Sequence, residues 1–100
     1  MNKEKIKQHI EVNVGLCVDV DLIFHESGRE SSIDYEDFRS VRKDGDKTII
    51  TYWTNDDDYP EESFAVTETV EEVKEIVKAA EDMIRKANKE YKIVRVKWSK

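Results

Sequence analysis

The 100-residue sequence contains few of the residues that cross-link or interrupt a chain: one cysteine, one proline and three glycines. With the single thiol of Cys17, no disulfide can form within the chain, as is typical of proteins in a reducing compartment. No apolar run approaches the roughly 18 residues that cross a bilayer, and the N-terminus lacks the continuous apolar stretch of a signal peptide. We therefore expect a cytosolic protein.

The sequence also lacks the motifs of common enzymes. No Cys-x-x-Cys, His-x-x-x-His or His-Glu-x-x-His occurs, and the glycines are too few and too scattered for a phosphate-binding loop. Cys17 and His25 would lie roughly 26 Å apart along a straight strand, too far for a nucleophile and its base. His9 approaches Cys17 only if the chain reverses between them. We expect no catalytic residues, no cofactor and no metal site.

Asp19 and Asp21 have a spacing that suits two-carboxylate glycoside hydrolysis, at about 7 Å along one face of a strand. The exposed face of any acidic sheet produces such pairs, and the sequence offers no sign of a substrate cleft beside them. We therefore interpret the pair as surface charge, and the protein as non-enzymatic.

Charge, in contrast, is abundant. Charged residues make up 40% of the chain, and the formal net charge is −6. Residues 10–40 hold eight acidic and two basic residues, and residues 55–75 hold nine acidic residues and one lysine. The last quarter, residues 76–100, is instead basic, with eight basic and three acidic residues. Such a polarised pattern offers surface for an oppositely charged partner.

An alternation of apolar and polar residues predicts several strands. Every even-numbered residue from Ile10 to Phe24 is apolar, which is the period of a half-buried strand. Fifteen residues in one strand would span about 50 Å, so Gly15 is expected either to bend this strand or to divide it in two. Residues 25–32 are interpreted as a polar loop. Further strands are expected over residues 38–42, 48–54 and 63–67, with a tight turn at Asp44-Gly45.

The period then changes to three and four residues, which predicts one amphipathic helix of about 20 residues beginning before Val73. Thr69 followed by Glu72 forms a capping box for its start. Asn88 is expected to be the left-handed residue at its end. Residues 91–98 alternate again and are expected to form a strand.

These elements give the fold class α+β. We expect a mainly antiparallel sheet of five or six strands, with one long helix from the C-terminal half packed on one face and followed by a final strand. Residues 1–100 are expected to form a single domain, in which residues 1–9 are a flexible extension.

A known pattern occurs in four segments: IDYEDF (33–38), TIIT (48–51), TN (54–55) and VTETVEEV (66–73). Together they resemble the short flagellar FlbD proteins, in which a strand ends in Thr-Asn-Gly and a Val-x-Glu-Thr-Val-Glu-Glu segment opens a helix. The resemblance covers about half of the chain. It implies a hairpin that leads into a capped helix. Asp56 replaces the glycine of the family pattern, and we carry over no site residues.

The sequence YWTNDDDYPEE, residues 52–62, has five carboxylates within seven residues. It lacks the ligand spacing of an EF-hand calcium loop, so beyond incidental cation binding we expect no metal there. We interpret it as a connection between strands whose charge suits a basic partner, although an acidic surface that only maintains solubility is the alternative. The expected protein-binding residues are Asp56, Asp57, Asp58, Tyr59, Glu61, Glu62, Asp19 and Asp21.

The leading hypothesis is a small regulatory domain that binds another protein through a sheet edge or an acidic face. One alternative is an inhibitor that imitates nucleic acid and occupies the basic groove of a DNA- or RNA-binding enzyme, as phage anti-restriction and anti-CRISPR proteins do. A second alternative is direct binding of single strands, which the net negative charge disfavours, by Tyr91, Lys92, Arg95 and Trp98. We expect no membrane partner, and an open strand edge would also allow a homodimer.

Overall fold

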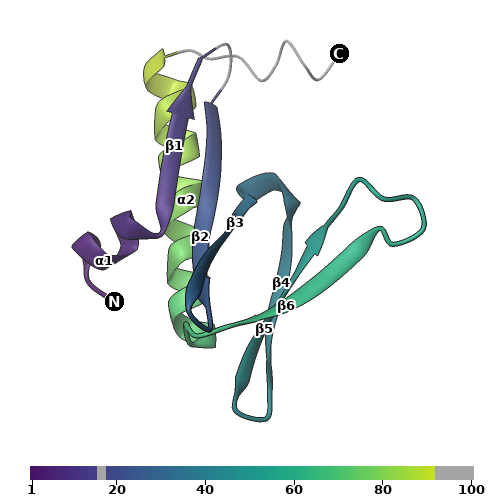
Figure 1. The fold of residues 1–100 in the computed structure, drawn as a ribbon. Coiled ribbons are helices and arrows are strands. Elements are labelled where there is room, and N and C mark those ends of the chain that lie inside the picture. The colour runs from purple at the N-terminus through teal and green to yellow at the C-terminus, as the bar shows by residue number, and fades with distance from the viewer. Residues whose placement is uncertain (16–17, 92–100) are drawn as a thin grey trace.

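The chain folds into two three-stranded antiparallel sheets and one long helix in a computed structural model that describes residues 1–15 and 18–91 (Figure 1). The α+β class is confirmed, but the strands form two sheets rather than one. In chain order the elements are α1 (Lys3–Gln8), β1 (Ile10–Val14), β2 (Val18–Glu26), β3 (Arg29–Asp34), the short 3₁₀-helix η1 (Tyr35–Asp37), β4 (Phe38–Asp44), β5 (Lys47–Trp53), β6 (Glu61–Val66) and α2 (Val70–Tyr91).

The first sheet has the order β1-β2-β3, with β2 in the centre. Of the two alternatives at Gly15, the structure has a division into two strands, because Ile10 lies opposite Leu22 and Val14 lies opposite Val18. The even-numbered residues of β2 are buried in the core beneath α2, as their alternation predicts: Val18, Val20, Leu22 and Phe24. The odd-numbered residues therefore lie on the opposite face of the sheet.

Strand β3 corrects the interpretation of residues 25–32 as a loop. Gly28 adopts a φ of 79° and reverses the chain, so that Arg29 pairs with Glu26 and the following residues pair back along β2. The sequence of β3, RESSID, is almost entirely polar. It therefore lacks the apolar alternation by which a strand is recognised, and the pairing with β2 sets its conformation instead.

The second sheet has the order β4-β5-β6 and confirms the three strands expected over these residues. Gly45 occupies the predicted tight turn with a φ of 61°. The two sheets separate at η1, where the carboxylate of Asp34 accepts a hydrogen bond of 2.8 Å from the backbone N–H of Glu36. This capped turn directs β4 away from the edge of β3, so a single continuous sheet does not form.

Helix α2 begins at the predicted capping box. The Thr69 N–H donates to Glu72 Oε1 at 2.9 Å, and the Glu72 N–H donates to Thr69 Oγ1 at 3.1 Å. The predicted end at Asn88 is wrong, since the helix continues to Tyr91. Asparagine does not stop a helix when residues that favour helix follow it, as Lys89 and Glu90 do here. Of the expected final strand, Tyr91 belongs to α2 and residues 92–98 lie outside the described residues.

The N-terminal stretch, expected as a flexible extension, contains α1. The Asn2 side chain accepts a hydrogen bond of 2.8 Å from the Lys5 N–H and so caps this helix. The terminal amine of Met1 lies 3.0 Å from Glu75 Oε2, on α2. This contact and the strand that follows hold α1 beside α2 and β1.

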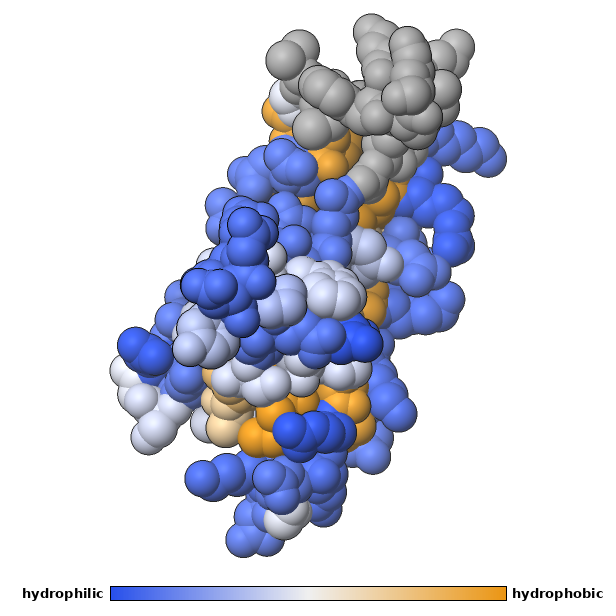
Figure 2. Space-filling model, turned by 90° about the vertical axis from the view of Figure 1, so that its right-hand side faces the viewer, coloured by the Kyte–Doolittle hydropathy of each residue, from blue (hydrophilic) through white to orange (hydrophobic). Residues whose placement is uncertain are grey.

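None of the helices in the described ranges is long and apolar enough to cross a membrane. The side of the molecule that faces the viewer in Figure 2 is mostly hydrophilic, with its hydrophobic surface broken into separate patches. Large apolar side chains that are exposed include Val12, Val14, Trp53 and Tyr59.

Candidate functional site

The expected protein-binding residues lie in two separate regions. Asp56, Asp57, Asp58 and Tyr59 belong to the connection between β5 and β6, at the opposite side of the view in Figure 1 from β1 and β2. Within the connection, the Asp58 N–H donates to Asp56 Oδ1 at 2.8 Å and the Asp56 N–H donates to Thr54 Oγ1 at 3.1 Å. Local turns of this kind are common in loops rich in Asp and Thr.

Two more carboxylates of that stretch lie on β6 and have partners within the second sheet. Arg39 pairs with Glu61, and its guanidinium carbon lies 4.8 Å from the ring centroid of Trp53. The Tyr52 hydroxyl donates to Glu62 at 3.4 Å. Burial raises the pKa of Tyr52, and the negative charge of Glu62 raises it further. Glu61 and Glu62 therefore already have neighbours that compete with any external partner.

Asp19 and Asp21 lie elsewhere, within a group of carboxylates that crosses the first sheet. Glu11 is opposite Asp21 between β1 and β2, and Asp21 is opposite Asp34 between β2 and β3. Side chains at opposite positions of an antiparallel pair share one face, with Cβ atoms about 5 Å apart. Burial raises the pKa of Asp21, and so do the charges of Asp34, Glu11 and Asp19. We call these four residues the carboxylate row.

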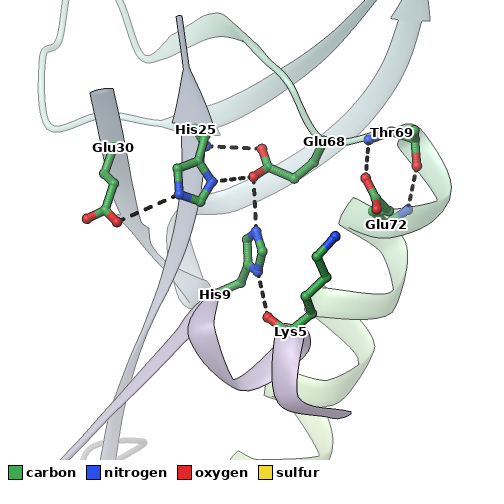
Figure 3. Close-up of polar contacts among 7 residues, drawn as sticks. All are labelled: Lys5, His9, His25, Glu30, Glu68, Thr69 and Glu72. Carbon is green, nitrogen blue, oxygen red and sulfur yellow. Dashed lines mark hydrogen bonds and ion pairs between the residues drawn. The ribbon is translucent and has the colours of Figure 1, made fainter. Parts of the chain in front are cut away.

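A second polar group is more deeply placed and comprises His9, His25 and Glu68, here called the His–Glu–His cluster (Figure 3). Glu68 Oε2 lies 3.0 Å from His9 Nε2 and 2.6 Å from His25 Nδ1. The other carboxylate oxygen, Oε1, accepts a hydrogen bond of 3.0 Å from the His25 backbone N–H. His9 and Glu68 are each only 6% exposed, whereas the side chain of His25 is 40% exposed.

The backbone around the cluster explains its position. His9 ends α1, and its carbonyl accepts a hydrogen bond of 2.7 Å from the Ile23 N–H, which brings it to the end of β2. The Thr67 N–H donates to the His25 carbonyl at 2.8 Å and brings the start of the β6–α2 connection to the same place. Glu68 therefore lies between the imidazoles of His9 and His25, which precede it in the chain by 59 and 43 residues.

The hydrogen bonds of His9 restrict where its protons lie. Nδ1 is 2.8 Å from the Lys5 carbonyl oxygen, which can only accept, so Nδ1 carries a hydrogen. Nε2 faces the carboxylate of Glu68, which also accepts when it is ionised. Nε2 is therefore the ring nitrogen that is directed at Glu68.

The surroundings of the cluster favour a positive charge on His25 and a negative charge on Glu68. The hydrogen bond to Glu68 raises the pKa of His25 above its ordinary 6.5 against the opposing effect of burial, and Glu30, 3.7 Å away, adds to the rise. For Glu68, burial favours the neutral form. The hydrogen bonds from the His25 backbone and ring, and from His9, outweigh burial, and the pKa of Glu68 lies below its ordinary 4.5.

These directions predict how the cluster contributes to stability as the pH changes. The contribution of Glu68 is complete above pH 4.5 and is lost as the pH falls through its lowered pKa. The contribution of His25 is complete below pH 6.5 and is lost as the pH rises through its raised pKa. The difference in free energy of unfolding between the wild type and His25→Gln should therefore be largest between pH 4.5 and 6.5.

The measurement is urea unfolding of both proteins across this pH range. Because the His25 side chain is substantially exposed, the amplitude should stay below about 1 kcal/mol. A difference that grows steadily toward alkaline pH would contradict the arrangement.

The cluster borders a surface hollow of about 260 Å³, which Lys5, Gln8 and Glu72 also line. One donor atom from each of His9, His25 and Glu68 lies within 4.8 Å of the others, so these residues have the geometry to hold a metal ion. No short ligand spacing joins His9, His25 and Glu68, so the sequence motifs of metal sites do not reveal this group. One feature of the sequence does point to it: a chain reversal at Gly15 would bring His9 to the same end of the sheet as His25. Cys17, the other residue considered with them, lies outside the described residues.

No protein family, curated protein or solved structure matches the chain. The resemblance to the FlbD proteins therefore gains no support.

Proposed function

We propose that this protein is a small non-enzymatic domain that acts in the cytoplasm by binding a basic surface of another protein. The observation that carries the proposal is the carboxylate row, Glu11, Asp19, Asp21 and Asp34. Like charges at opposite positions of a strand pair are destabilising. A cationic partner would relieve this repulsion, and the negative charge of the row would attract it to this face of the sheet.

The position of β1 supports the same surface. Among the described strands, β1 is at the end of its sheet and has a neighbour on one side only. Val12 and Val14 are exposed, on the face opposite Glu11. A basic extended segment that pairs with β1 would place cationic side chains beside Glu11 and apolar ones beside Val12. A second copy of this chain fits less well, because pairing two β1 strands would bring two acidic faces together.

An inhibitor that imitates nucleic acid is the second candidate, because it would use the same row. The distance of the Asp56–Asp58 connection from the row weighs against it, since mimicry of a phosphate backbone gains from one continuous acidic surface. Direct binding of single strands depends mainly on Lys92, Arg95 and Trp98, which lie outside the described residues.

Two variants with matched charge test the proposal. Neutralising the row by Glu11→Gln, Asp21→Asn and Asp34→Asn should weaken binding to a protein partner at least about 10-fold and flatten its dependence on salt. Neutralising Asp56, Asp57 and Asp58 to Asn should change the affinity much less. The measurement is a titration of a partner recovered from the native cell, repeated at several ionic strengths.

Unfolding experiments serve as the control for these variants. Asp21→Asn should leave the protein folded and raise its free energy of unfolding by a few tenths to about 1 kcal/mol, because it removes like-charge repulsion. Equal loss of affinity in both triple variants, or none in either, would refute a role for the row. Turnover of a substrate in a broad hydrolase and nucleotide screen would refute the non-enzymatic assignment.

A further inference from the structure

We propose that His9, His25 and Glu68 form a binding site for a divalent transition-metal ion, and that zinc is the ion this site suits best. Two imidazoles and one carboxylate are a donor set that zinc commonly takes in proteins. This site is distinct from the carboxylate row, and it does not depend on the protein-binding function proposed above.

The distances within the cluster suit an ion after a small adjustment. Zinc lies about 2.0–2.2 Å from nitrogen and oxygen donors, which places two donors of a tetrahedral site roughly 3.3 Å apart. Glu68 Oε2 is at present 3.0 Å from His9 Nε2 and 2.6 Å from His25 Nδ1. These two pairs have to open by less than about an ångström, and the donor nitrogens of His9 and His25, which lie within 4.8 Å of each other, have to approach to about 3.3 Å. Modest side-chain rotations supply both changes. The three donors point toward one another from different elements (Figure 3).

The surroundings orient the donors before any ion arrives. The hydrogen bond from His9 Nδ1 to the Lys5 carbonyl selects the tautomer whose Nε2 is available to a metal. Glu30 lies 3.7 Å from His25 Nε2 and can hold that ring when Nδ1 binds the metal. The His25 backbone N–H fixes Glu68 Oε1 and leaves Oε2 toward the site. Such outer contacts are the usual companions of metal-binding imidazoles and carboxylates.

The site is also accessible. The surface hollow of about 260 Å³ reaches the cluster, and the side chain of His25 is exposed to solvent. Three protein donors leave one position of a tetrahedral ion for water. A zinc ion between the three donors would bring two positive charges against the single negative charge of Glu68.

The test uses the full chain without an affinity tag and with Cys17→Ser, so that neither a tag nor the thiol binds the metal. In a calorimetric titration with zinc chloride at neutral pH, binding should saturate at one ion per chain. Zinc should raise the melting temperature and a chelator should reverse the rise. Cobalt(II) should give the intense visible absorption of a tetrahedral ion, which the hydrated ion lacks.

Ligand variants identify the residues involved. Glu68→Gln and His25→Ala should each weaken zinc binding at least about 100-fold, since even outer-contact losses reach that size. Glu71→Gln is the matched control, because it removes the same charge three residues away and should leave the affinity unchanged. His25→Ala keeps the test valid if Glu68→Gln does not fold, because the His25 side chain is 40% exposed. Absence of saturable binding, or equal binding by the wild type and His25→Ala, would overturn the proposal.

Discussion

Replacing Phe24 with alanine should lower the free energy of unfolding by about 3–5 kcal/mol. Phe24 is fully buried on β2 and belongs to the core that α2 covers, together with Leu22, Val73 and Ile76. Its removal takes away a large apolar surface and leaves a cavity that the sheet and the helix can fill only in part. In a domain of this size the loss is a large fraction of the total stability.

Urea unfolding of Phe24→Ala, compared with Val14→Ala, is the appropriate measurement. Val14 lies on the same face of the first sheet but is 54% exposed, so its truncation should change the free energy of unfolding by no more than about 0.5 kcal/mol. A cost below about 1 kcal/mol for Phe24→Ala would mean that β2 does not lie at the centre of the core.

The second large effect is expected at Glu68, which is buried although it carries charge. Glu68→Ala should lower the free energy of unfolding by about 3 kcal/mol at pH 6. The change leaves the His25 N–H and the buried His9 ring without the acceptor that they share. The loss is larger than that of a surface ion pair because few water molecules can replace the carboxylate around His9.

Glu71→Ala provides the comparison, because Glu71 is exposed in the first turn of α2 and should cost less than about 0.5 kcal/mol. A double-mutant cycle of Glu68→Ala with His25→Ala should give a coupling of about 0.5–3 kcal/mol. If the two effects simply add, Glu68 and His25 do not interact in solution.

The elements that the sequence predicts correctly are those whose buried residues recur every two residues, as in a strand, or every three to four, as in a helix. The alternation in β2 and the capping box at Thr69 are local signals, and both are confirmed. Strand β3 has no such signal, since its polar residues are held by pairing with β2. The division into two sheets depends on the turn at η1, which periodicity does not record. The end of α2 is not marked by Asn88, because the helix-favouring residues after it carry the helix to Tyr91.

The His–Glu–His cluster could not be predicted in the same way. His9 and His25 approach each other only once β1 and β2 are known to pair. Glu68 joins them only because the end of β6 lies beside the end of β2, through the Thr67 to His25 hydrogen bond. That contact follows from how the two sheets pack, and no spacing within the sequence specifies it. The acidic connection, by contrast, was conspicuous in sequence and proves to be separate from Asp19 and Asp21.

The long sequence separation of the Glu68 contacts has a kinetic consequence. Glu68 meets partners 59 and 43 residues earlier in the chain, whereas the hairpins and α2 are built from near neighbours. Closing so large a loop is entropically unfavourable, so contacts of this kind tend to form after the local ones, late on the folding pathway. An interaction absent from the transition state slows unfolding without speeding folding. The cluster should therefore slow the unfolding of the native state, and any cation that bridges its three side chains would slow it further.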